Sequence, residues 1–148
     1  MKINHWTSPP GSLELKMGDV QVWDARLDHQ DASDFSHWLN DEEQKRAARM
    51  HSTTLADYFV IGRGILRCLL GAYLDVLPGD VEFGYSRQGK PALSGSLEGY
   101  ISFNVSHSNG LAVYAFARGQ EVGVDIEEYR PLKDMDSMAA MTFSLEEC

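Results

Sequence analysis

The chain has 148 residues, of which 43% are hydrophobic, and its formal net charge is −9. This length and apolar content suit one ordinary domain with its own core. The negative charge argues against general nucleic-acid binding, because that binding depends on excess Lys and Arg. The sequence lacks a run of about 18 apolar residues that could span a bilayer, and its first residues lack the apolar core of a signal peptide. We therefore expect a soluble cytoplasmic protein that binds neither nucleic acid nor membrane.

The cysteines give no sign of a disulfide framework or a zinc site. Cys68 lies in an apolar stretch and Cys148 is the last residue. Neither belongs to a CxxC motif or a Cys/His cluster. Both are compatible with the reducing cytosol.

Positive charge is concentrated in one part of this acidic chain. Residues 45–67 contain a single acid, Asp57, and a set of basic residues that we call the basic island: Lys45, Arg46, Arg49, Arg63 and Arg67. A local excess of positive charge suits a small polyanion. For Lys45, Arg46 and Arg49, a solvated helix face is the alternative interpretation.

The first half of the chain is predicted to be mainly helical. Residues 1–12 are expected to be irregular, and residues 20–23 alternate like a strand. Asn40 and Glu43 have the spacing of an N-cap and its capping-box partner, which predicts a helix that runs to about Met50.

A second, longer helix is predicted to form the core. Apolar residues recur at helical spacing from Leu55 to Leu77, and the pattern stops at Pro78. Arg63 and Arg67 are four residues apart, so we expect them to share the exposed face of this helix.

A rigid turn is predicted at Gly89-Lys90-Pro91. Pro91 fixes its own φ and Gly89 permits a tight turn. A lysine held on such a turn can bind a phosphate as a point charge. Because the three-residue pattern is common by chance, a purely structural turn is the alternative.

The second half is predicted to be a sheet. Residues 101–105, 111–117 and 121–127 alternate like strands, and the short connections between them predict an antiparallel meander. Two chain reversals would bring the polar stretch around Ser106 and His107 to the same end of the sheet as the acids of the last strand. The tail beyond residue 129 is Met-rich at roughly helical spacing, which is typical of core packing.

Two acids in the last predicted strand form a candidate metal site. Residues two apart in a strand share a face, so Asp125 and Glu127 point one way while Val124 and Ile126 point the other. Carboxylates about 6 to 7 Å apart along a strand can converge on one hard cation. Seen alone, the same pair is more often the wet face of a half-buried strand.

The ordered set of motifs resembles the 4′-phosphopantetheinyl transferases, specifically the larger surfactin-synthetase-activating type. The resemblance covers about residues 40–147. Its pieces are the basic helix with Arg46 and Arg49, Gly62-Arg63, Leu66-Arg67, Gly89-Lys90-Pro91, Phe103-Asn104-Val105-Ser106-His107-Ser108 and Val122-Gly123-Val124-Asp125-Ile126-Glu127.

The resemblance implies transfer of the phosphopantetheine arm from coenzyme A to a serine of an acyl or peptidyl carrier protein, in fatty-acid, polyketide or non-ribosomal peptide synthesis. Asp125 and Glu127 would hold Mg²⁺, or alternatively Mn²⁺, on the pyrophosphate. The expected contacts to coenzyme A phosphates are Arg46, Arg49, Arg63, Lys90, Ser106 and His107. We expect Asp125, Glu127 and His107 to form the catalytic group.

The resemblance also implies an α+β fold in which an antiparallel sheet packs on a long helix and a second, pseudo-symmetric lobe is only begun. We expect residues 1–120 to form the N-terminal transferase lobe and residues 121–148 to start the C-terminal lobe. The family's downstream Trp-x-x-Lys-Glu motif is absent from this sequence. We therefore interpret the chain as a truncated or fragmentary transferase.

Two alternatives are open at this point. One is a non-catalytic form that binds coenzyme A or a carrier protein with an incomplete site. The other is a resemblance of fold alone, in which the acids and the histidine are ordinary surface residues.

Overall fold

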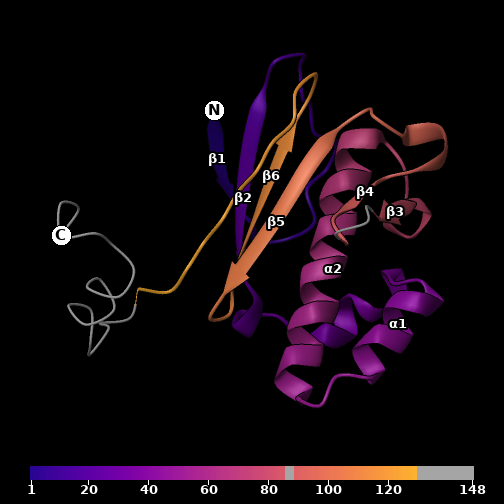
Figure 1. Cartoon of the computed structure of the whole chain (residues 1–148), viewed down its shortest axis with the longest axis vertical. Coiled ribbons are helices and arrows are strands. Elements are labelled where there is room, and N and C mark those ends of the chain that lie inside the picture. The colour runs from indigo at the N-terminus through magenta and orange to yellow at the C-terminus, as the bar shows by residue number, and fades with distance from the viewer. Residues whose placement is uncertain (86–88, 130–148) are drawn as a thin grey trace, which may run out of the picture.

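A computed structural model describes residues 1–85 and 89–129. In it a four-stranded sheet packs against one long helix, and a short helix and a hairpin lie beside them (Figure 1). The expected α+β class, with antiparallel pairing in the sheet and a long core helix, is confirmed. Within the described ranges, no helix is long and apolar enough to cross a membrane. The Met-rich tail lies outside the described residues.

The sheet has the strand order β1-β2-β6-β5. Its strands are β1 (Lys2–His5), β2 (Val20–Arg26), β5 (Ser102–Ser108) and β6 (Leu111–Ala117). Strands β2 and β5 both pair with β6 in antiparallel fashion, whereas β1 is parallel to β2. The expectation of an irregular stretch over residues 1–12 was therefore wrong for β1. Its partner is distant in sequence, so no local pattern signals the pairing.

The long helix α2 (Thr53–Leu74) provides the other layer of the core. The side chain of Ser52 caps its N-terminus by accepting a hydrogen bond from the Leu55 backbone N–H. Ile65 and Leu69 of α2 are fully buried, as are Tyr114 and Phe116 of β6. The helix ends three residues earlier than the predicted Leu77, because Asp75 takes a left-handed conformation.

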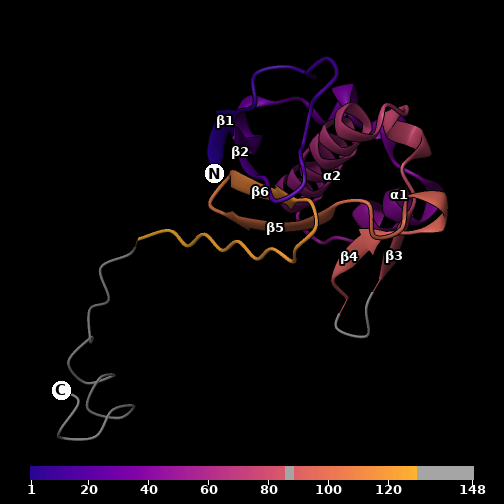
Figure 2. The same ribbon diagram turned by 90° about the horizontal axis from the view of Figure 1, so that it is seen from above.

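The short helix and the hairpin lie to one side of α2 (Figure 2). The short helix α1 (Asp41–Ala48) begins with the predicted capping box between Asn40 and Glu43. A small hairpin joins β3 (Phe83–Tyr85) to β4 (Pro91–Leu93). Single 3₁₀ turns occur at Leu27–His29, Ala32–Asp34, Ser36–Trp38, Pro78–Asp80 and Gly95–Leu97.

The stretch after β6 departs from the predicted meander. Residues 121–128, which we call the acidic segment, are extended but form no strand. They run parallel to β5, on the sheet face turned away from α2 (Figures 1 and 2). The prediction of an antiparallel third strand was wrong, because the chain crosses to β5 instead of turning back beside β6.

Candidate functional site

Side chains of β5 hold the acidic segment in place of a strand ladder. Every second residue of β5 points to the face opposite α2, and all four of these residues are polar. Three of the four accept a hydrogen bond from a backbone N–H of the acidic segment. The pairs are Asn104 with Val124 (3.1 Å), Ser106 with Ile126 (3.1 Å) and Ser108 with Glu128 (3.0 Å). We call these three side chains the polar ladder.

The middle rung of the ladder also contacts a predicted metal ligand. The Ser106 hydroxyl donates a hydrogen bond of 2.8 Å to Asp125 Oδ1. Asp125 and Glu127 are exposed, and they alternate with the half-buried Val124 and Ile126. The two motifs that the sequence predicted to lie together therefore meet at Ser106 and Asp125.

His107 is not brought into contact with these acids. It lies within β5, so its side chain points to the face opposite that of Ser106. In the part of the chain that the structure describes, no hydrogen bond or ion pair joins His107 to Asp125 or Glu127. Because β5 is the outermost strand of its sheet among the described residues, a ligand at this edge can still reach both faces.

The predicted Lys90 turn lies beside the same edge. Gly89 has a φ of +79°, so the backbone there takes the left-handed conformation that glycine favours. The exposed Lys90 ammonium is 3.8 Å from a carboxylate oxygen of Glu121. A cavity of about 280 Å³ is lined by Gly89, Lys90, Pro91, Phe103, Asn104 and Val105. The turn and β5 thus form the walls of one pocket.

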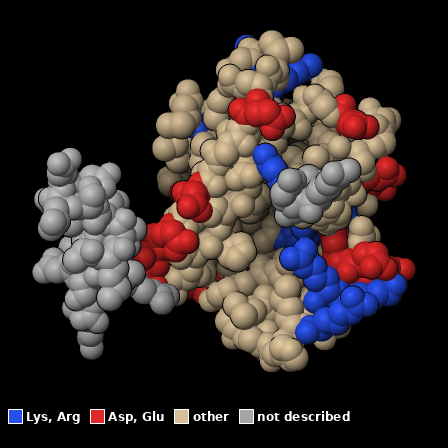
Figure 3. All heavy atoms as spheres, in the orientation of Figure 1, with Lys and Arg blue, Asp and Glu red and all other residues tan. Residues whose placement is uncertain are grey.

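The basic island divides into an exposed part and a buried part. Lys45, Arg46 and Arg49 are exposed, and Figure 3 shows Lys and Arg atoms gathered over α1 and reaching toward the middle of that face. The alternative of a solvated face fits Lys45, which pairs with Glu42 at 2.9 Å on the helix surface. Arg46 instead lies over the Phe59 ring, 5.0 Å from its centroid.

Arg67 is buried and Arg63 is half-buried, so the prediction that they share an exposed face was wrong. The Arg67 side chain is 1% exposed and binds the Glu43 carboxylate at 2.8 Å. Its Nη1 also donates to the carbonyls of Pro78 and Val81. The Arg63 side chain is 9% exposed and lies 3.4 Å from the same carboxylate. The spacing of these arginines shows that they share a helix face, but it cannot show that Glu43, a residue of another helix, neutralises them.

The guanidinium groups of Arg63 and Arg67 also make cation–π contacts with aromatic rings. The Arg63 guanidinium lies 4.9 Å from the Phe83 centroid and 5.8 Å from that of Phe59. The Arg67 guanidinium also contacts Phe83, 5.0 Å from the centroid of that ring. Such contacts stabilise a cation by about 0.5 to 2 kcal/mol each. They fix the basic side chains between α1, α2 and β3.

The acid pair has the right chemistry for a hard cation. Both ligands are carboxylates, the oxygen donors that Mg²⁺ prefers, and the Ser106 hydrogen bond fixes one of them. Within residues 1–85 and 89–129, no group of three or more His, Cys, Asp or Glu side chains is placed to hold a metal ion. Two protein carboxylates completed by substrate oxygens and water fit the way Mg²⁺ binds in phosphate-transfer sites.

Asn104 and Ser108 lie in a recognised motif but had no predicted role, and Glu43 was predicted only as a capping residue. The signal for the first two was available, because Asn104, Ser106 and Ser108 form a polar stripe at period two on one strand face. Glu43 offered no such signal. Its burial and its two arginine partners depend on how α1 packs against α2.

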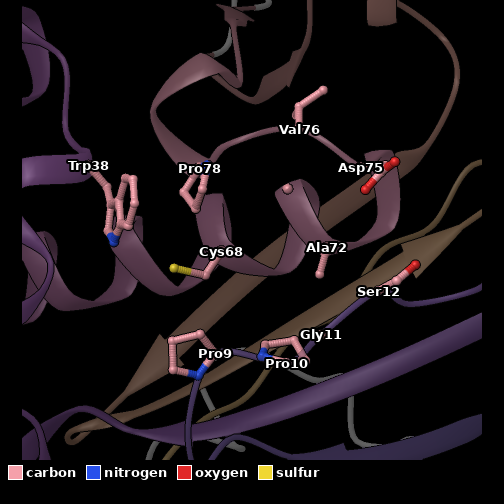
Figure 4. Close-up of a pocket in the computed structure, with 11 residues that line it drawn as sticks. Pro9, Pro10, Gly11, Ser12, Trp38, Cys68, Ala72, Asp75, Val76 and Pro78 are labelled. Carbon is pink, nitrogen blue, oxygen red and sulfur yellow. The ribbon is translucent and has the colours of Figure 1, made fainter.

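A second cavity, of about 250 Å³, lies away from this site (Figure 4). Its lining includes Pro9, Pro10, Trp38 and Cys68, and none of its residues belongs to the candidate site. Burial raises the pKa of the Cys68 thiol to about 11. The thiol is therefore protonated at neutral pH and is a poor nucleophile.

Comparison with known proteins identifies the relatives of this fold. The family described as 4′-phosphopantetheinyl transferase, N-terminal, matches residues 23–118. The 4′-phosphopantetheinyl transferase HetI of Nostoc sp. is 38% identical over 141 residues, which are 93% of this chain and 60% of that protein. The 4′-phosphopantetheinyl transferase AcpT of Salmonella typhi is 41% identical over 81 residues, which are 55% of this chain and 40% of that protein. A phosphopantetheinyl transferase of Thraustochytrium sp. is 28% identical over 133 residues, which are 88% of this chain and 44% of that protein.

The chain thus spans 60% or less of the length of each of these relatives. The matched region begins within β2 and includes α1, α2, the hairpin, β5 and β6, and so it covers most of the described fold. On the strength of that match, the chain belongs to the 4′-phosphopantetheinyl transferase family.

Proposed function

We propose that the chain takes part in the transfer of the 4′-phosphopantetheine arm from coenzyme A to a serine of an acyl or peptidyl carrier protein. In this reaction the serine oxygen forms a bond to the β-phosphorus while the pyrophosphate bond breaks. The serine loses its proton and 3′,5′-adenosine bisphosphate leaves. The observation that carries the proposal is the hydrogen bond between Ser106 and Asp125, because it joins the two motifs on which the resemblance depends. A cytoplasmic location belongs to the same proposal.

Lys90 and three arginines of the basic island are proposed to bind the phosphates of coenzyme A. Lys90 is supported by its place on the wall of the pocket beside β5. Arg46 and Arg49 are supported by their exposure on α1. Arg63 has less direct support. Its Nη1 has no hydrogen-bond partner in the described chain, which suits an anion, but the same atom is shielded from solvent.

The polar residues of β5 complete the proposed coenzyme A contacts. His107 is exposed and can reach the edge of the sheet. Ser106 remains a predicted phosphate contact, although its only hydroxyl proton already serves Asp125. We propose Asp125, Glu127 and His107 as the catalytic group of this site.

Asp125 and Glu127 are proposed to hold Mg²⁺, with Mn²⁺ as an alternative. When bound, the ion would neutralise charge on the pyrophosphate and orient the β-phosphate. The two side chains contribute carboxylate oxygens on the exposed side of the acidic segment. Val124 and Ile126, half-buried on its other side, keep the segment oriented.

We further propose that residues 1–120 form the N-terminal lobe of the transferase and that residues 121–148 begin a second lobe. The family match to residues 23–118 supports the first lobe. The separate course of the acidic segment, which leaves the β5–β6 sheet, supports a boundary near residue 120.

A paired measurement tests the proposal. The chain is incubated with coenzyme A, Mg²⁺ and an apo carrier protein, and both thermal stability and carrier mass are recorded. We expect coenzyme A to raise the melting temperature and the carrier to gain one phosphopantetheine arm. Asp125→Asn should abolish the mass gain, whereas Glu128→Gln, which removes the same charge nearby, should preserve it.

A second candidate function is binding without transfer. It rests on the candidate metal site, since within residues 1–85 and 89–129 no group of three or more His, Cys, Asp or Glu side chains is placed to hold a metal ion. A thermal shift with coenzyme A but no mass gain would favour this candidate. The absence of both effects would contradict both functions.

A further inference from the structure

The polar ladder is unusual because it replaces strand pairing with side-chain hydrogen bonds. Backbone N–H groups of a segment beside a sheet normally pair with backbone carbonyls of the neighbouring strand. Here the N–H groups of Val124, Ile126 and Glu128 are satisfied by one amide and two hydroxyl side chains of β5. The position of the acidic segment therefore depends on the side chains of β5, and substitution can remove each rung separately.

Ser106 differs from the other residues of the polar ladder because its hydroxyl also binds a proposed metal ligand. Its oxygen accepts the Ile126 N–H at 3.1 Å and its proton goes to Asp125 at 2.8 Å. A serine hydroxyl has one proton to donate, so this residue has committed its donor to the carboxylate. The neighbouring rung differs, because Ser108 binds the Glu128 N–H and contacts neither Asp125 nor Glu127 through any hydrogen bond of the described chain.

We infer that Ser106 is a positioning residue, which holds the Asp125 carboxylate and the Ile126 amide so that Asp125 is oriented before a ligand arrives. The inference rests on the proposed function of Asp125 as a metal ligand. It assigns Ser106 a role through Asp125, in addition to the phosphate contact implied by the family resemblance. Groups that orient a metal ligand typically change metal affinity by about 10-fold to 100-fold when removed.

Three variants separate positioning from general support of the acidic segment. Ser106→Ala removes both hydrogen bonds, Ser106→Thr keeps the hydroxyl, and Ser108→Ala removes a matched hydroxyl that serves no proposed ligand. Ser106 and Ser108 are half-buried outside the core, so we expect all three variants to fold. Circular dichroism checks this expectation.

Two readouts are measured on the whole 148-residue chain. The first is amide hydrogen exchange of residues 124, 126 and 128 without any ligand. Loss of one hydrogen bond should speed the exchange of the Ile126 amide about fivefold in Ser106→Ala, from the usual net strength of such a bond. The second is Mn²⁺ binding followed by electron paramagnetic resonance in the presence of coenzyme A, which should weaken about 10-fold in the same variant.

The expected pattern is specific. Ser106→Thr should restore both readouts, and Ser108→Ala should speed exchange of the Glu128 amide without changing Mn²⁺ affinity. Equal losses of Mn²⁺ affinity in Ser106→Ala and Ser108→Ala would overturn the inference, as would no loss in Ser106→Ala.

A native chain that binds no Mn²⁺ would show that the proposed metal site is wrong. In that case, hydrogen exchange of the Ile126 amide still tests the positioning role of Ser106. Unchanged exchange of the Ile126 amide in Ser106→Ala would overturn the positioning role. Faster exchange, with the Glu128 amide unaffected, would support it.

Discussion

Two glycines of α2 occupy contrasting positions in the packing. A Cβ at Gly64 would lie 2.5 Å from the Cβ of Phe35, whereas a Cβ at Gly62 would meet nothing closer than the Tyr114 hydroxyl at 3.6 Å. Phe35 is itself buried in the core. The 3₁₀ turns on either side of Phe35 can therefore approach the helix this closely only because residue 64 has no side chain.

Gly64→Ala is expected to destabilise the protein by about 1 to 3 kcal/mol, because the added methyl overpacks the contact with Phe35. Gly62→Ala is the matched control in the same helix. It should stabilise the protein by up to about 1 kcal/mol, since alanine is the better helix former. Urea unfolding followed by circular dichroism measures both. Equal effects of the two substitutions would show that the Phe35 contact does not limit residue 64.

At the scale of elements, one buried carboxylate joins α1 to α2. Glu43 is 3% exposed, and it caps the N-terminus of α1 while also binding Arg67 and approaching Arg63 of α2. The Arg67 guanidinium in turn donates to the carbonyls of Pro78 and Val81. The orientation of α1, and with it that of Arg46, therefore depends on a charge network inside the protein.

Glu43→Gln should destabilise the fold by about 3 to 5 kcal/mol, because it leaves two buried guanidinium groups without their anion. Glu42→Gln is the control, since Glu42 and its partner Lys45 are both largely exposed. That change should stay within about 0.5 kcal/mol. Guanidinium chloride unfolding gives both values, and a small effect at Glu43 would mean that α1 is held mainly by other contacts.

At the scale of the whole molecule, buried tyrosines set the stability at high pH. Burial raises the pKa of Tyr114 far above its ordinary value of 10 and that of Tyr73 to about 12. The Tyr73 hydroxyl accepts from the Trp23 indole and donates to Gln21, and the Tyr114 hydroxyl donates to the Gly62 carbonyl. Both phenols thus link the sheet to α2 in their neutral form.

The sign of the pH effect follows from which state keeps the proton. Above pH 10 the unfolded chain loses the tyrosine protons while the folded protein keeps them, so the folded state binds more protons and its stability falls as pH rises. Tyr114 should contribute a loss of about 1.4 kcal/mol for each pH unit. Unfolding free energies measured from pH 9 to 11.5 test this, with Tyr114→Phe expected to flatten the slope. Tyr129→Phe should leave the slope unchanged, because Tyr129 is 91% exposed.

Local patterns in the sequence determined much of this protein. The Asn40 capping box, the course of α2 and the strand from Leu111 to Ala117 were all predictable, because each depends on neighbours within a few residues. The motif residues were also recognisable, since Ser106 and Asp125 keep the family's order. The roles given to the proposed site residues stay predictions until ligand binding is measured.

Only the tertiary structure decided where those residues meet. It paired β1 with β2, placed Arg63 and Arg67 against the buried Glu43, and directed the acidic segment along β5. In each case the deciding partner is distant in sequence, so periodicity gives the polarity of a residue but not the group that satisfies it. Burial of a charge or placement of an unpaired segment is settled by packing between elements, which is a property of the whole fold.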